Sequence, residues 1–94
     1  MRTIEVFILD RGVVLTSMLL TLDEESRVRA IKCAASQKLL EIQGPRAGVT
    51  LRLYRQDFWG EKELRDKTKI KNIRDTVDAR FVIIPFVVPK KVQP

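Results

Sequence analysis

Residues 26–42 read SRVRAIKCAASQKLLEI and decide the fold. Apolar residues recur along this stretch at intervals of three, four, four and three positions, namely Val28, Ile31, Ala35, Leu39 and Ile42. This spacing is typical of a single buried stripe on an amphipathic α-helix. Asp23 or Ser26 can cap its start, and Gly44-Pro45 can end it, because proline cannot continue a helix. One amphipathic helix needs a sheet on which to bury its apolar stripe.

The rest of the chain predicts the strands of that sheet. Alternating apolar and polar residues indicate strands over residues 3–9, 13–22, 49–55 and 80–88. The sequence Asp10-Arg11-Gly12 predicts a hairpin turn between the first two. Weaker patterns indicate a turn at 57–60, a short strand at 61–65 and one helical turn within 67–74. A hairpin followed by a helix and a returning strand places the first and last strands side by side and parallel, so we expect an α+β fold.

The order and spacing of these elements resemble the ubiquitin-like β-grasp family over about residues 3–88. The resemblance rests on the hairpin at Gly12 and on apolar residues at similar intervals, namely Leu20, Leu22, Val28, Ile31, Ala35, Leu51, Leu53, Leu64, Ile70, Ile73, Phe81 and Ile83. It implies a mixed sheet of about four to five strands packed on one central helix at residues 26–42. Residues 1–88 would form the domain, and residues 89–94 a tail or the start of a linker.

The C-terminal sequence narrows what the resemblance implies. Family members that become conjugated to other proteins end in a diglycine, whereas this sequence has no glycine after Gly60. The resemblance therefore implies a built-in, N-terminal ubiquitin-like domain of a larger scaffold protein, a cytoskeletal scaffold being one case.

Composition excludes most enzymatic chemistry. The 94 residues include no histidine and a single cysteine, Cys33, so catalytic pairs and metal cages built on these residues are excluded. No glycine-rich phosphate loop occurs. The acidic run Asp23-Glu24-Glu25 is interpreted as charge at the start of the helix rather than as a cation site. We therefore expect a protein without enzymatic activity, cofactor, metal or small-molecule ligand.

Three further features predict the cellular location. Met1 is not followed by a charged and then apolar leader, which indicates a protein that is not secreted. The longest apolar-rich run, residues 13–22, is too short to span a bilayer. A lone cysteine is typical of a reducing compartment. We expect a cytoplasmic protein, associated with the cytoskeleton if the scaffold interpretation holds.

The outward side of the predicted sheet defines the candidate binding site. Strand alternation turns seven side chains away from the helix, namely Phe7, Leu9, Arg52, Tyr54, Val82, Ile84 and Phe86. Such a patch usually marks a protein interaction site, although the same residues can serve strand formation alone. Arg52 stands where the family's ubiquitin-receptor ligands present an aliphatic residue, which favours a partner segment that is both acidic and apolar. Trp59 joins the candidate partner-binding residues, although a lone tryptophan at a strand end is more often a lid on the core.

Two alternative functions follow from charge and fold. The formal net charge is +6, from 18 basic and 12 acidic residues, which suits a protein that binds a polyanion such as a microtubule or nucleic acid. The basic residues are spread over helix, loops and strands, so nucleic acid is the weaker interpretation. A Ras-association or FERM-lobe domain would bind a small GTPase through its second strand, but residues 13–22 carry no basic side chain.

Overall fold

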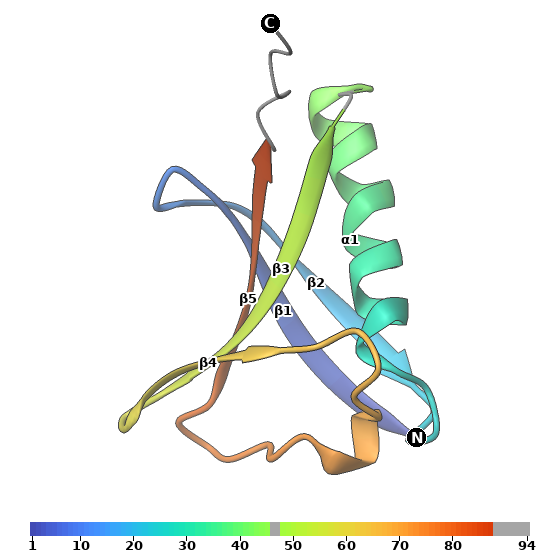
Figure 1. Ribbon diagram of the computed structural model, residues 1–94, viewed down its shortest axis with the longest axis vertical. Coiled ribbons are helices and arrows are strands. Elements are labelled where there is room, and N and C mark those ends of the chain that lie inside the picture. The colour runs from blue at the N-terminus through green and yellow to red at the C-terminus, as the bar shows by residue number, and fades with distance from the viewer. Residues whose placement is uncertain (46–47, 88–94) are drawn as a thin grey trace, which may run out of the picture.

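The computed structural model describes residues 1–45 and 48–87, so the predicted tail at residues 89–94 lies outside the described residues. The fold has two layers, a five-stranded sheet and one helix (Figure 1). The elements are, in order, β1 (Arg2–Asp10), β2 (Val13–Leu22), α1 (Val28–Gln43), β3 (Val49–Asp57), β4 (Gly60–Leu64), the 3₁₀ turn η1 (Ile70–Asn72) and β5 (Arg80–Val87). Every predicted element is present, which confirms an α+β fold with one helix on a mixed sheet.

The strand order in the sheet is β2-β1-β5-β3-β4. β1 and β5 are parallel, with Ile8 opposite Ile83, and the other neighbouring strands are antiparallel. The first and last strands are therefore neighbours, as predicted, because α1 carries the chain across one face before it returns. Pairing of β5 with β1 ends at Ile83, two residues before Pro85, in agreement with the missing N–H of proline.

A tight two-residue turn joins β1 to β2. Arg11 has a φ of 53° and Gly12 a φ of 79°, so both residues occupy the left-handed region. A turn with two such residues matches the right-handed twist of a hairpin, and glycine adopts this conformation without a Cβ penalty. Beyond the turn Leu9 pairs with Val14 but Ile8 with Thr16, which leaves one extra residue on β2 as a β-bulge.

The core lies between α1 and the inner face of the sheet. Its buried side chains come from the helix, all five strands and the η1 region: Ile4, Val6, Ile8, Met18, Val28, Ile31, Ala35, Leu39, Leu53, Leu64, Ile70, Ile73, Phe81 and Ile83. Leu20, Leu22 and Leu51 pack against this cluster and are partly buried. All apolar residues that carry the family resemblance therefore lie in the core or at its margin.

Ile42 does not complete the buried stripe of the helix, so this prediction is wrong. Its exposed fraction is 46%, whereas Leu39, one turn earlier, is 7% exposed. Figure 1 shows that the β1–β2 hairpin turns away from the C-terminal end of α1, so that less of the sheet lies opposite this end. Helical periodicity sets the direction of a side chain, but the twist of the sheet decides how far it extends beneath the helix.

The side-chain cap predicted for α1 is also wrong. The helix begins at Val28, and Arg27 at the N-cap position makes no capping hydrogen bond with its side chain. Asp23 instead holds the turn that precedes the helix, because its Oδ1 accepts a hydrogen bond from the Glu25 N–H at 2.8 Å. The Asp23 carboxylate therefore binds a backbone N–H of this turn and not one of the helix. Ser26 makes no capping hydrogen bond either.

Backbone carbonyls from a distant segment cap the helix. Val28 N donates to Thr68 O at 2.9 Å, and Arg29 N donates to Asp66 O at 3.3 Å. The first N–H groups of a helix have no acceptor within the helix, so they need partners from elsewhere. Here the loop between β4 and η1 supplies them.

Glu25 joins the same region through charge. Its carboxylate accepts hydrogen bonds from Lys71 Nζ at 2.8 Å and from Lys69 Nζ at 3.0 Å. These hydrogen bonds and the two lysine charges lower the pKa of Glu25 from 4.5 to about 2.

We expect Glu25→Gln to make the stability of the fold less sensitive to acid. Because the folded-state pKa lies below the unfolded-state value, the interaction stabilises the fold above about pH 4.5 and is lost as the pH falls towards 2. Urea unfolding at about pH 6 and about pH 2.5 should show a smaller loss of stability for the variant than for the wild type. Glu5→Gln is the control, because Glu5 makes no ion pair among the described residues. Equal losses in all three proteins would contradict this prediction.

Candidate functional site: the outward face of the sheet

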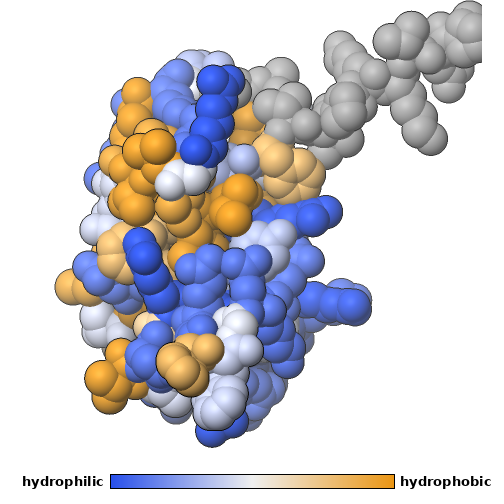
Figure 2. All heavy atoms as spheres, turned by 90° about the vertical axis from the view of Figure 1, so that its left-hand side faces the viewer, coloured by the Kyte–Doolittle hydropathy of each residue, from blue (hydrophilic) through white to orange (hydrophobic). Residues whose placement is uncertain are grey.

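The face of the sheet opposite α1 carries the predicted binding residues. Phe7, Val82 and Tyr54 stand in register across β1, β5 and β3. Arg52 lies opposite Ile84 in the next row. We call the complete set the outward patch: Phe7, Leu9, Arg52, Tyr54, Val82, Ile84 and Phe86. Figure 2 views the molecule from this side and shows hydrophobic residues gathered in its upper half, above a more hydrophilic lower half.

Val82 is the buried centre of the outward patch. Its exposed fraction is 0%, although it lies on the face away from the helix and takes no part in the core cluster. Its neighbours Phe7, Tyr54 and Ile84 are half-buried. The outward patch therefore packs on itself as a second, smaller apolar cluster.

Two arginines cover aromatic rings on this face. Arg80 Cζ lies 4.6 Å from the ring centroid of Phe7, and Arg52 Cζ lies 4.7 Å from that of Phe86. Both distances allow cation–π attraction. Arg80 is absent from the predicted site, although strand alternation with Val82 places it on the same face and could have identified it.

Arg52 supplies the charge of the outward patch. Its side chain is 51% exposed, and its Nε lies 3.8 Å from Glu63 Oε2. A hydrogen bond with the Tyr54 side chain, followed by the charge of Glu63, raises the pKa of Arg52. A separation of 3.8 Å is too long for a hydrogen bond, and exposed ion pairs contribute little to stability. A carboxylate from a partner can therefore replace Glu63 at small cost.

Trp59 lies apart from the seven residues of the outward patch, at the turn between β3 and β4. Its exposed fraction is 88%, so its interpretation as a core lid is wrong. Its ring packs edge-to-face on Phe58, with centroids 5.5 Å apart. Asp57 holds the turn, because its Oδ1 accepts hydrogen bonds from Trp59 N at 2.8 Å and from Gly60 N at 3.1 Å. Contact of Trp59 with a partner stays a prediction.

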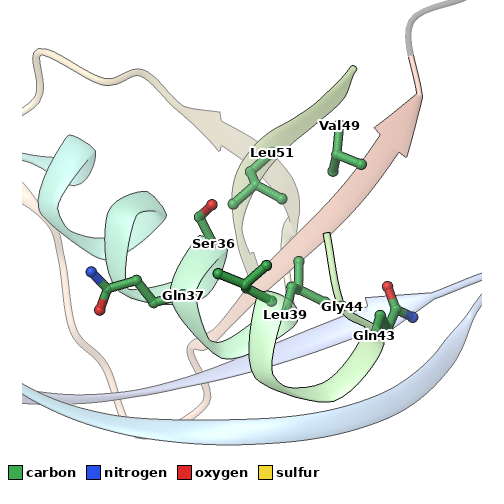
Figure 3. A pocket seen from close by; sticks show the side chains of 8 residues that line it. Ser36, Gln37, Leu39, Gln43, Gly44, Val49 and Leu51 are labelled. Carbon is green, nitrogen blue, oxygen red and sulfur yellow. The ribbon is translucent and has the colours of Figure 1, made fainter. Parts of the chain in front are cut away.

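A small hollow lies between the C-terminal half of α1 and the start of β3 (Figure 3). Its volume is about 190 Å³, and its lining comprises Ser36, Gln37, Leu39, Leu40, Gln43, Gly44, Val49 and Leu51. Figure 3 shows Leu39 and Leu51 between helix and strand, with Gln37 and Gln43 at the two ends. Small-molecule sites usually measure roughly 300–1,000 Å³ and include polar groups that orient the ligand. This hollow is smaller, and its described lining carries no charge.

Basic residues that are spread along the sequence partly come together at the start of α1. The capping hydrogen bonds bring residues 65–69 against residues 27–29, and Arg27 pairs with Lys69 in an isolated β-bridge. Four bases on these segments have no ion-pair partner among the described residues, and we call them the basic cluster: Arg27, Arg29, Arg65 and Lys67. The basic cluster lies at the N-terminal end of α1, whereas the outward patch lies on the face of the sheet opposite α1.

Among residues 1–45 and 48–87, no group of three or more histidine, cysteine, aspartate or glutamate side chains could hold a metal ion. No helix in the described part of the chain is long and apolar enough to cross a membrane. No family model and no curated protein sequence matches the chain.

Proposed function

We propose that this chain is a ubiquitin-like β-grasp domain that acts as a non-catalytic protein interaction module for a larger scaffold protein. Its partner is a protein segment that is both acidic and apolar, bound on the outward patch. One observation carries the proposal: the half-exposed Arg52 guanidinium lies on Phe86 within an apolar cluster, and its ion pair with Glu63 is long, at 3.8 Å.

The surroundings of Arg52 suit it to a carboxylate. Phe86 lies against one face of the guanidinium, with Arg52 Cζ 4.7 Å from the ring centroid. This contact restricts the side chain before a partner arrives, which reduces the entropy lost on binding. A planar guanidinium binds a carboxylate through two parallel hydrogen bonds, and this gives geometric specificity for Asp or Glu.

The neighbours of Arg52 supply the apolar part of the site. Leu9, Ile84 and Phe86 are half-buried, so a partner would complete their burial. Each square ångström of apolar surface removed from water contributes about 25 cal/mol. Arginine and aromatic residues are enriched among the side chains that dominate binding energy. The outward patch thus combines a charged anchor with apolar surroundings.

Peptide display followed by titration tests this proposal. A random peptide library is selected on the immobilised domain, and enriched sequences should combine Asp or Glu with apolar residues. Phe86→Ala and Tyr54→Ala should each lower the affinity for an enriched peptide by about tenfold. Neither residue belongs to the core cluster, so both variants should fold. Phe58→Ala is the matched control, because it makes the same change at a ring that is 84% exposed on the β3–β4 turn.

Circular dichroism melting shows whether each variant is folded. If Phe86→Ala does not fold, Phe86→Leu replaces it, because it is a smaller change. Affinities that stay unchanged in the folded Phe86 and Tyr54 variants would contradict binding on the outward patch. Enriched peptides without acidic residues would contradict the role given to Arg52.

Polyanion binding is a second candidate function, and the basic cluster favours it. Four bases on two adjoining segments, none of them in an ion pair within residues 1–45 and 48–87, form the kind of surface that attracts phosphate chains. Titration with a short DNA duplex at about 50 mM and about 200 mM salt separates the two functions, because polyanion binding weakens steeply with salt. Binding by the basic cluster would also be insensitive to Phe86→Ala.

A further inference from the structure

β2 forms one edge of the sheet, and in the described part of the chain no strand lies on its outer side. It is ten residues long and reads VVLTSMLLTL, without a charged residue, a proline or a glycine. Natural edge strands usually carry such residues, because the unpaired N–H and C=O groups of an edge can pair with another chain. The opposite edge, β4, follows this rule, since it has five residues with the sequence GEKEL. β2 has a β-bulge between Val14 and Thr16, but from Thr16 to Leu22 it carries none of these features, so this part of β2 is the less protected edge.

Apolar surface accompanies the edge. Val13 is 63% and Leu19 is 72% exposed. A groove of about 360 Å³ lies between β2 and α1, and its lining is mixed: Met18, Leu19, Leu20 and Ala34 are apolar, whereas Ser17, Gln37, Lys38 and Glu41 are polar or charged. A strand added at this edge would therefore gain apolar contacts beside its backbone hydrogen bonds.

The charges at the two ends of β2 select a second copy of the chain as the added strand. Arg11 lies just before β2 and has no ion-pair partner among the described residues, whereas the acidic residues 23–25 lie just after it. Directly opposite residues of an antiparallel pair point to the same face of the sheet. In a symmetric pair one residue therefore lies opposite its own copy, with the two-fold axis midway between them, and Ser17 and Met18 are the central candidates. Either register brings Arg11, in the turn before β2 of one copy, close to the acidic residues 23–25 that follow β2 of the other. Glu24 already pairs with Arg2, and Glu25 pairs with Lys69 and Lys71. Asp23 has no ion-pair partner among the described residues, so it is the acid that we pair with Arg11.

We propose that two copies of this chain associate through β2, as an antiparallel pair that joins their sheets into one. The two-fold axis makes each Arg11 contact occur twice, and it puts no like charges opposite one another within the uncharged strands. Both helices then lie on one face and both outward patches on the other, where they stay free. A dimer would present two outward patches to a partner with repeated motifs, which increases avidity. The association itself does not depend on the function proposed for the outward patch.

Sedimentation velocity of the full chain over about 5–500 µM tests the association. We expect a monomer–dimer equilibrium that moves towards the dimer as concentration rises. Ser17→Lys brings like charges together near the axis and should lower the association constant by about fivefold or more. Thr50→Lys is the matched control, because it adds the same charge at an exposed position of β3, which is not an edge strand, and should have little effect.

Variants of Arg11 test the charge contact without disturbing the turn. Arg11→Asp creates an Asp-Gly pair, which is favoured in turns of this kind, and reverses the charge at both symmetric contacts. It should lower the association constant by about tenfold, and Arg11→Asn, which makes the equally favoured Asn-Gly pair, should have a smaller effect.

A chain that stays monomeric throughout would overturn the proposal, as would association that Ser17→Lys and Arg11→Asp leave unchanged. Species larger than dimers would indicate head-to-tail pairing of β2 with β4 and would also overturn it. Arg11→Asp decides the matter if Ser17→Lys fails to fold. A monomeric Arg11→Asp variant should still bind the peptides selected on the outward patch, so failure of one proposal is distinguishable from failure of the other. Ser17→Lys does not serve for this comparison, because Ser17 lies opposite Phe7 of the outward patch.

Discussion

Ile31→Ala is expected to lower the free energy of unfolding by about 2–5 kcal/mol. Ile31 lies on the buried stripe of α1 with an exposed fraction of 0% and belongs to the core cluster. Truncation removes apolar burial and leaves a cavity that close-packed neighbours fill only in part. Ile42→Ala is the matched control, because it makes the same change on the same stripe of the helix. Ile42 is 46% exposed, so its truncation should cost less than about 1 kcal/mol.

Urea unfolding followed by circular dichroism measures both values. The difference between the two variants reports where the sheet stops covering the helix, since their chemistry is identical. Equal losses would mean that the end of α1 is packed as tightly as its middle, which would contradict the arrangement in Figure 1.

Arg52→Glu is expected to lower the affinity for an acidic, apolar peptide by about tenfold to a hundredfold. The substitution replaces attraction for the peptide carboxylate with repulsion, and it also removes the cation from the ring of Phe86. The fold should persist, because the side chain is 51% exposed. Arg29→Glu is the matched control, since it makes the same change in net charge on α1, across the sheet from the outward patch. Isothermal titration calorimetry gives both affinities. Equal losses of affinity in the two variants would mean that Arg52 acts only through the net charge of the domain.

Two periodicities in the sequence predicted most of the fold. Helical spacing identified Val28, Ile31, Ala35 and Leu39 as buried, and strand alternation separated the inner Leu53 from the outward Tyr54. Both signals are local, because the direction of a side chain follows from its place in one helix or strand. Their agreement along the whole chain is what made the order of the elements predictable.

Features that depend on distant residues could not be predicted in this way. The carbonyls of Asp66 and Thr68 cap a helix that begins about forty residues earlier, whereas the sequence next to Arg27 offers Ser26, which makes no capping hydrogen bond. Arg2 donates hydrogen bonds to Ile70 O at 2.9 Å and to Ile73 O at 2.7 Å, which fastens η1 to β1. Such contacts follow from the assembled fold and leave no periodic pattern in the sequence.

The candidate site shows the same division. Alternation predicted that Phe7, Arg52 and Phe86 share a face, since each strand could be considered alone. The complete burial of Val82 depends on the register of three strands, and the approach of Glu63 to Arg52 depends on the register of β4. The sequence did not decide whether Trp59 covers the core or is exposed, because its position at the tip of a turn depends on where β3 ends.

A charge exchange at Arg52 is the most direct measurement of the proposed function. A peptide enriched on the wild-type domain is compared with a copy in which its acidic residue is replaced by lysine, and both are titrated against the wild type and Arg52→Glu. We predict that the acidic peptide prefers the wild type and the lysine peptide prefers Arg52→Glu, each by about tenfold or more. If both proteins instead prefer the same peptide, Arg52 does not recognise the acid, and the outward patch is not the binding site for such segments.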